Sequence, residues 1–291
     1  MAVSIFRSKE LPGDKAHRVA LLKQARFEVI PLKNLAAQLP FLPAASEVSV
    51  TASPAKSLED TWSLSRELSK MGMKPIPHLA ARMITGQDQL RMLIDQLPDI
   101  GASELFLVGG DAPEPFGPFN DSIQVLEVIL GMKHELTHIG VTAYPDGHSF
   151  IDSEVLSESL HKKEALLKGS GVEGHAATQM CFDPRTIRTW LSEERKRGLK
   201  LPIHLGVPGA VERTKLLSIG ARLGVGASLR FLKKNRATLA RMFAPGGYDP
   251  DKLLRPLNPE LKSLGVEGLH VFTFNQVQST VTWRDEAIAG S

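Results

Sequence analysis

Polar side chains recur where short apolar runs of this chain come to an end. Carboxylates and imidazoles can move protons, and hydroxyls and amides can hydrogen-bond a polar ligand. If the apolar runs are parallel strands of one barrel, their carboxyl ends share a face, where barrel enzymes hold their catalytic groups. We therefore predict one site at that face. Its candidate residues are Glu28, Thr51, His78, Asp111, Tyr144, His148 and Gln179.

One local motif indicates a different chemistry. The stretch HELTH, residues 134–138, matches the H-E-x-x-H pattern, in which two histidines on one helix face bind zinc. Gly131 comes just before it, and residues 139–143 form an apolar run typical of a buried strand. His138 would then begin a strand and could not share a helix face with His134. We interpret the motif as a loop before a strand and predict no metal site.

Apolar, β-branched runs alternate with segments of helical periodicity along the chain. The predicted strands are Arg26–Ile30, Glu47–Thr51, Lys74–His78, Glu104–Val108, His138–Ala143, His175–Gln179, Leu201–Leu205 and Leu269–Thr273. The predicted helices include Leu58–Lys70, Gln87–Leu97, Asp121–Leu130, Asp152–Lys168, Asp183–Arg197 and Val211–Leu217. Asp183 followed by Pro184 is typical of a helix start.

This alternation predicts a parallel sheet with right-handed crossovers. Eight strands in 291 residues is the number of a (β/α)8 barrel, and no segment is rich enough in Gly, Pro or Ser to divide the chain. We therefore predict an α/β protein with one (β/α)8 TIM-barrel domain over residues 1–291. Residues 1–24 form an N-terminal extension that we expect to cover the barrel base. The alternative, a doubly wound open sheet, lacks its usual G-x-G-x-x-G, and we interpret Gly224-Val225-Gly226 as a turn.

Composition and charge narrow the function classes. Hydrophobic residues make up 42% and charged residues 23%, as in ordinary soluble globular proteins. The net charge is +3, and the basic cluster Lys233–Arg236 is short enough to be a solvated helix face, so we expect no nucleic acid partner. The single cysteine, Cys181, excludes a disulfide within the chain and suits the cytoplasm. We expect neither a signal peptide nor a membrane span.

Seven short motifs follow one another along the predicted strands. They are Phe27–Pro31, Val48–Thr51, Pro77–Leu79, Gly110–Pro113, Ala143–His148, Ala177–Asp183 and Val271–Asn275. Their order and spacing resemble those of the methylenetetrahydrofolate reductases, in which the patterns are F-E-F-F-P-P, V-S-V-T, P-H-L, G-D-x-P, A-Y-P-E-x-H, I-T-Q-F-F-F-D and F-Y-T-L-N. Each motif is short, so the shared order carries the resemblance, which runs from residue 27 to residue 275.

The resemblance implies a barrel enzyme that interconverts 5,10-methylene- and 5-methyltetrahydrofolate. In this family FAD usually relays hydride from NADH or NADPH. The methylene bridge must open to an iminium ion before hydride adds, and opening requires a proton on the departing nitrogen. A carboxylic acid at a strand end can supply this proton, and strand alternation aims Glu28 away from its apolar neighbours. Glu28 is therefore our candidate general acid, and a plain salt-bridge partner is the alternative.

The resemblance also implies roles for the other strand-end residues. Asp111 follows two glycines, which let the backbone come close to a flat ligand. It would lie between pterin and flavin, where its carboxylate stabilises the developing positive charge and binds the pterin. Gln179 would anchor the pterin through its amide. The positions that line the flavin or hold its phosphates are Thr51, His78, Tyr144, His148 and Lys168.

Two departures from the family weaken the expected flavin site. The family usually has Arg-Gly-Asp where this chain has Gly109-Gly110-Asp111, so a cation near the flavin is replaced. Four helix residues that hold the flavin ribose and phosphates fall on His161, Glu164, Leu167 and Lys168, and only the lysine matches. A flavin-free enzyme that passes hydride directly from the nicotinamide to the folate is therefore a second form of the same hypothesis.

Two other functions agree with the same residues. A folate- or pterin-dependent methyl-transfer barrel without redox chemistry would use Asp111 and Gln179 equally well. A non-catalytic barrel that binds a folate has no need of Glu28 opposite the pterin anchor. In every case the expected partner is a tetrahydrofolate derivative, and analogy with the family suggests a homo-oligomer.

Overall fold

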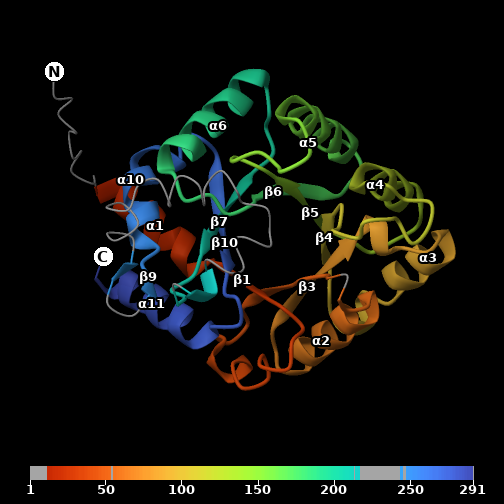
Figure 1. Cartoon of the computed structure of the whole chain (residues 1–291), viewed down its shortest axis with the longest axis horizontal. Coiled ribbons are helices and arrows are strands. Elements are labelled where there is room, and N and C mark those ends of the chain that lie inside the picture. Colours follow the sequence, from red (N-terminus) through yellow and green to blue (C-terminus); the bar gives the residue numbers. More distant parts are fainter. Residues whose placement is uncertain (1–11, 54, 213, 217–242, 245–246, 291) are drawn as a thin grey trace.

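The computed structural model describes residues 12–53, 55–212, 214–216, 243–244 and 247–290. In it, eight parallel strands close into a barrel, and helices form a ring around the outside (Figure 1). Around the barrel the strand order is β1-β10-β7-β6-β5-β4-β3-β2. The predicted (β/α)8 barrel is therefore confirmed, and the alternative of an open sheet is wrong because the sheet closes on itself.

The strands lie close to their predicted positions. They are β1 (Arg26–Val29), β2 (Glu47–Val50), β3 (Lys74–Ala80), β4 (Glu104–Val108), β5 (His138–Ala143), β6 (Glu173–Thr178), β7 (Ile203–Pro208) and β10 (Val266–Phe272). The prediction started β7 at Leu201, two residues too early. Pro202 has no N–H to donate to a neighbouring strand, and the ladder begins at the next residue.

Helices connect the strands and cover them from outside. They are α1 (Pro12–Lys23), α2 (Leu58–Lys70), α3 (Gln87–Asp95), α4 (Ser122–Gly131), α5 (Ser153–Leu167), α6 (Pro184–Arg197), α10 (Asp251–Leu261) and α11 (Val277–Ala289), with short 3-10 turns η1 (Leu39–Phe41), η2 (Ala81–Met83) and η3 (Pro98–Ile100). Side chains cap several starts. Ser57 and Asp60 form a capping box at α2, and Asp183 accepts the Arg185 N–H at α6. A short antiparallel pair, β8 (Phe243–Ala244) and β9 (Gly247–Tyr248), precedes α10.

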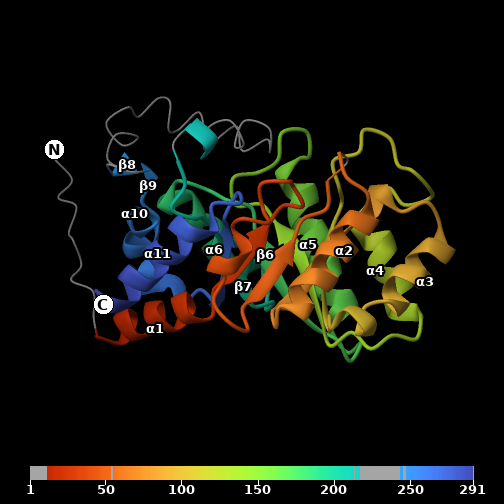
Figure 2. The same ribbon diagram turned by 90° about the horizontal axis from the view of Figure 1, so that it is seen from below.

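The segment before the first strand forms a helix on the outside of the barrel. This helix, α1, packs against α10, α11 and β10 (Figure 2). Residues 1–11 of the expected N-terminal extension lie outside the described residues, as do the expected turn at 224–226 and the basic cluster at 233–236. Of the helix expected at 211–217, residues 214–216 are helical. Within the described ranges, no helix has the length and apolar character that a membrane crossing needs.

The inside of the barrel is polar. Arg26 on β1 contacts Glu104 on β4, and because these strands are not neighbours, the two side chains meet across the interior. Arg26 Nη2 lies 3.0 Å from Glu104 Oε2, its Nε lies 2.6 Å from Glu47 Oε2, and its Nη1 lies 3.2 Å from His175 Nε2. Branched aliphatic side chains usually fill such barrels. Here most of the apolar core lies between the sheet and its helices, and the interior holds charged and imidazole groups beside a small apolar cluster of Ile76, Phe106 and Ala177.

Candidate functional site

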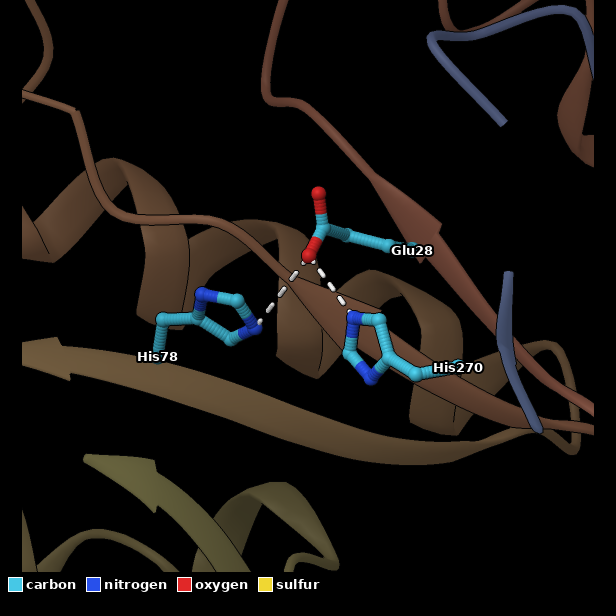
Figure 3. Close-up of side chains that lie close together, drawn as sticks. All are labelled: Glu28, His78 and His270. Atoms are coloured by element: carbon cyan, nitrogen blue, oxygen red, sulfur yellow. Dashed lines mark hydrogen bonds and ion pairs between the residues drawn. The ribbon is translucent and has the colours of Figure 1, made fainter. Parts of the chain in front are cut away.

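Glu28 lies near the carboxyl end of β1 and points into the barrel. Its neighbours Phe27 and Val29 belong to the apolar core, so strand alternation turns Glu28 inward. Its Oε2 lies 2.8 Å from Nε2 of His270 on the adjacent β10 and 3.9 Å from Nε2 of His78 on β3 (Figure 3). The Glu28 side chain is 12% exposed, whereas both histidines are buried. Three strands thus converge on one carboxylate that remains partly open to solvent.

The loop after β10 fixes the end of β1. Asn275 accepts the Ile30 N–H through Oδ1 and donates from Nδ2 to the Ile30 carbonyl, each at 2.9 Å. Its φ of 56° lies in the left-handed region, where asparagine is enriched. Thr273 donates its hydroxyl to the Glu28 carbonyl at 2.6 Å. The backbone that carries Glu28 is therefore held from the same side as His270.

His78 is buried among groups that disfavour its charged form. Its Nε2 is hydrogen-bonded to the Ser49 hydroxyl at 2.6 Å, and its ring packs on Phe106 with ring centres 4.7 Å apart. Burial, and to a smaller extent the neighbouring His270, lowers the pKa of His78 well below its usual range. The sequence predicted that His78 lines a flavin. The structure places it in the Glu28 group inside the barrel.

The ligand atoms of Glu28, His78 and His270 all lie within 4.8 Å of one another, so the three side chains could hold a metal ion. Two imidazole nitrogens and one carboxylate oxygen form a ligand set known for zinc and for non-haem iron. Sequence reasoning missed this group, because His270 follows Glu28 by 242 positions and no spacing motif joins them.

The H-E-x-x-H stretch does not form a zinc helix. Residues 133–137 are not helical, and His138 begins β5, as predicted. His138 Nε2 lies 2.9 Å from Glu173 Oε2 at the start of the neighbouring β6. The motif therefore lies at the amino ends of the strands, on the barrel face opposite the strand-end residues.

Asp111, Tyr144 and His148 form a second group, on the loops after β4 and β5. Burial raises the pKa of Tyr144; a side-chain hydrogen bond with Thr142 opposes this rise, and the Asp111 carboxylate adds to it. Burial lowers the pKa of His148, and the same carboxylate opposes that shift. The rings of Tyr144 and His148 meet edge to face with centres 5.4 Å apart. These loops therefore gather three of the predicted residues at the carboxyl ends of the strands, the barrel mouth.

Arg82, which no sequence pattern singled out, holds the loop that carries Asp111. Its guanidinium donates to the carbonyls of Ala112, Pro113 and Asn120 at 2.7, 2.6 and 3.3 Å. Hydrogen bonds from a charged donor are stronger than neutral ones. Because the acceptors are backbone atoms, their residue types give no signal of this role.

Two buried polar atoms among the predicted residues have no hydrogen-bond partner in the described part of the chain. They are Oγ1 of Thr51 and Nδ1 of His148. Buried polar atoms are nearly always paired in folded proteins, so each marks a place where a ligand atom can bind. Gln179 accepts the Met180 N–H on its Oε1 at 2.9 Å, so its amide nitrogen is the atom that could donate to a ligand.

Lys168 lies away from these residues. It is the exposed C-cap of α5, and β6 begins five residues later. Because each outer helix runs back toward the amino ends of the strands, Lys168 lies at the end of the barrel opposite the mouth. On the same helix, His161 Nε2 pairs with Glu194 at 3.0 Å, and Glu164 accepts backbone N–H groups before β7. The α5 positions that the resemblance assigned to flavin phosphates thus make structural contacts or face solvent.

A surface cavity of about 390 Å³ opens between α5 and α6. Tyr144 forms part of its wall, as does Trp190 of α6. Arg197 and Glu154 also line the cavity, and they form an ion pair in which Arg197 Nη1 lies 3.0 Å from Glu154 Oε1. Tyr144 therefore lies both at the mouth and beside a space that a longer ligand could enter.

Comparisons with known proteins support the fold. No protein-family model matches this chain. It is similar to a solved structure from Clostridium thermocellum, described as an uncharacterized protein that binds two copies of 5-methyl-5,6,7,8-tetrahydrofolic acid. That match has a TM-score of 0.63 and 13% identity, and it covers 94% of this chain and 99% of the other. A chitinase from Rhizomucor miehei matches with a TM-score of 0.49 and 11% identity, over 91% of this chain and 99% of the other. At 13% identity the match to the Clostridium thermocellum structure shows a TIM-barrel fold.

Proposed function

We propose that this protein is a folate oxidoreductase of the methylenetetrahydrofolate reductase type, which interconverts 5,10-methylene- and 5-methyltetrahydrofolate with NADH or NADPH. The observation that carries the proposal is Glu28, a partly open carboxyl group held by His270 near the carboxyl end of a barrel strand. The strand-end motifs support the same reaction. A barrel of similar fold that binds methyltetrahydrofolate also supports a folate ligand.

Glu28 donates the proton that is needed when 5,10-methylenetetrahydrofolate is reduced. The proton goes to the departing nitrogen of the methylene bridge as the nitrogen–carbon bond breaks, and an iminium ion remains on the other nitrogen. Hydride from the nicotinamide then adds to the iminium carbon and gives the methyl group. Glu28 is left as a carboxylate, and the N–H of His270 stabilises this charge through the 2.8 Å hydrogen bond.

The residues of the mouth bind and orient the folate. Asp111 lies on a loop braced by Arg82, and its carboxylate offsets the positive charge of the iminium ion. The amide nitrogen of Gln179 donates to the pterin edge. The unpaired atoms of Thr51 and His148 supply further hydrogen bonds to the bound ligands.

The described residues fit only part of a flavin site. Thr51 and His148 offer hydrogen bonds to a ring system, but His78 is engaged with Ser49. Lys168, the one phosphate-binding residue that the resemblance retained, lies at the opposite end of the barrel. These residues do not fit a flavin diphosphate, so we derive no step through FAD.

Direct hydride transfer from NADH or NADPH is therefore the form of the reaction that we favour. The nicotinamide would lie at the mouth beside the folate. The remainder of the dinucleotide would extend past Tyr144 into the cavity of about 390 Å³ between α5 and α6, where Trp190 offers an aromatic surface.

Steady-state assays of the purified full chain test this proposal. We expect oxidation of NADH or NADPH that depends on 5,10-methylenetetrahydrofolate, with 5-methyltetrahydrofolate as the product and no added FAD. Turnover that appears only with FAD would refute direct transfer and retain the reductase. Binding of 5-methyltetrahydrofolate without nicotinamide-dependent turnover would overturn the oxidoreductase and favour methyl transfer or folate binding alone.

A further inference from the structure

We propose that Glu28, His78 and His270 bind one divalent transition-metal ion, with Zn²⁺ as the type ion. Binding of the metal ion does not depend on the folate reaction, because the three side chains supply its ligand atoms and no folate is needed. Its consequence rests on the proposed function: a carboxylate that binds a cation does not hold a proton, so the metal-bound protein cannot use Glu28 as its acid.

The separations of the ligand atoms suit an ion of this size. Bonds of about 2.0–2.1 Å in a tetrahedral zinc site place neighbouring ligand atoms about 3.3 Å apart. Oε2 of Glu28 lies 2.8 Å from Nε2 of His270 and 3.9 Å from Nε2 of His78, one value on each side of that spacing. All three ligand atoms lie within 4.8 Å of one another. On binding an ion, the side chains would rotate to open the shortest of these separations and to close the longer ones.

The directions of the side chains agree with these distances. Both imidazole nitrogens point toward the same oxygen of Glu28, and the second carboxylate oxygen points away from both rings (Figure 3). An ion between the three atoms would replace the hydrogen bond and the ion-pair contact that Glu28 makes there. The second oxygen would stay on the side away from the histidines.

The groups around the three ligands hold them in place. Each ligand sits on a strand of the closed barrel, and side chains on rigid elements keep their geometry better than side chains on loops. The Ser49 hydroxyl is hydrogen-bonded to Nε2 of His78 at 2.6 Å, so an ion bound at this nitrogen would displace that hydrogen bond. Phe106 packs on both rings, with centres 4.7 Å from His78 and 5.6 Å from His270.

The donor atoms decide the class of ion. Magnesium and calcium prefer sites built from oxygen atoms, whereas imidazole nitrogens suit zinc, cobalt and iron. Two histidines and one glutamate leave at least one coordination position for water or another ligand. Since Glu28 is the partly exposed member of the group, that position is accessible from its solvent side.

Titration with Co²⁺ tests the site directly, because Co²⁺ occupies zinc sites and its visible absorption reports imidazole and carboxylate ligands. The full chain is first treated with a chelator and then titrated with Co²⁺ alone, followed by Zn²⁺ in competition. We expect one ion per chain, displaced by Zn²⁺. Glu28→Gln, His78→Gln and His270→Gln should each weaken binding by more than about 100-fold, beyond the 10–100-fold typical of outer contacts. Ser49→Ala frees Nε2 of His78 from its hydrogen bond and should not weaken binding.

His204→Gln is the matched control, because His204 is another histidine inside the barrel that stacks on His175 and is not one of the three ligand residues. It should leave Co²⁺ binding unchanged. Circular dichroism and thermal unfolding of every variant show whether it is folded. A folded wild type without a Co²⁺ spectrum, or with binding that all three ligand variants retain, would overturn the proposal.

The two proposals can fail separately. If the reductase is correct and the metal site is wrong, turnover persists at Zn²⁺ concentrations well above the protein concentration. If the metal site is correct and the reductase is wrong, the Co²⁺ spectrum and its loss in the three variants remain. If both are correct, Zn²⁺ inhibits turnover reversibly, and a chelator restores it.

Discussion

Replacement of Arg26 by alanine should destabilise the barrel strongly at neutral pH. Arg26 is 11% exposed and binds Glu104, which is 12% exposed, from across the barrel interior. Without the guanidinium, Glu104 becomes a buried carboxylate without its cation, and loss of one partner of a buried pair costs about 3–5 kcal/mol. Domains are stable by about 5–15 kcal/mol, so this is a large part of the total.

The stability lost in Arg26→Ala should depend on pH, and the protonation of Glu104 determines whether the loss grows or shrinks on acidification. Burial raises the pKa of Glu104 even though the charge and hydrogen bonds of Arg26 lower it. A raised folded-state pKa means that the folded protein holds the proton more tightly than the unfolded chain, so this group costs stability as pH rises through that pKa. Arg26→Ala removes the cation that lowers the pKa of Glu104, so this pKa rises further in the variant. The variant should therefore recover part of its stability at mildly acidic pH, where Glu104 is protonated.

Urea unfolding of three variants, at neutral and at mildly acidic pH, measures this effect. Arg197→Ala is the control, because Arg197 pairs with Glu154 on the surface, where such pairs contribute little to stability. The double variant Arg26→Met/Glu104→Leu replaces the buried pair by apolar groups and should recover most of the loss. The reasoning is refuted if Arg26→Ala is no less stable than Arg197→Ala, or if its deficit grows on acidification.

Three further changes test other parts of the account. Arg82→Ala removes charged hydrogen bonds of about 1.5–3 kcal/mol each from the Asp111 loop. Steady-state kinetics should show a KM for the folate raised about tenfold or more, and thermal unfolding should show a lower melting temperature. Thr51→Val removes a buried hydroxyl that has no partner among the described residues. Titration with 5-methyltetrahydrofolate should show about tenfold weaker binding, and thermal unfolding should show equal or higher stability. Lower stability would mean that the hydroxyl has a partner within the protein. Gly206→Ala should abolish soluble barrel, seen as loss of native circular dichroism, because a Cβ there would lie 1.9 Å from the Thr178 carbonyl oxygen.

The barrel could be predicted from sequence because strands and helices alternate with clear local signals. The prediction was weakest where local and tertiary preferences disagree. The helix α10 contains Pro256 and Pro259, which ordinarily argue against a helix interior, and its apolar face packs on α6 and α1 regardless. The helix α10 was therefore not among the predicted helices, although the strand before α11 was predicted.

The site could be predicted only in part, because a polar residue at a strand end shows which face it occupies and not which residues it meets. Glu28 and Asp111 are at the carboxyl side of the barrel, as expected. The contacts of Glu28 with His270 and His78 depend on strand register and on barrel closure, which no local pattern contains. Lys168 was assigned by counting positions, without regard to the direction of α5, and that direction carries it away from the mouth.

The account depends most on Glu28 as the proton donor, and the kinetics of Glu28→Gln test this directly. Glutamine keeps the size of the side chain and removes the transferable proton. The account predicts that kcat/KM for 5,10-methylenetetrahydrofolate falls by about 10²–10⁴-fold, while affinity for 5-methyltetrahydrofolate and the melting temperature stay close to those of the wild type. Full turnover in a folded Glu28→Gln variant would contradict it.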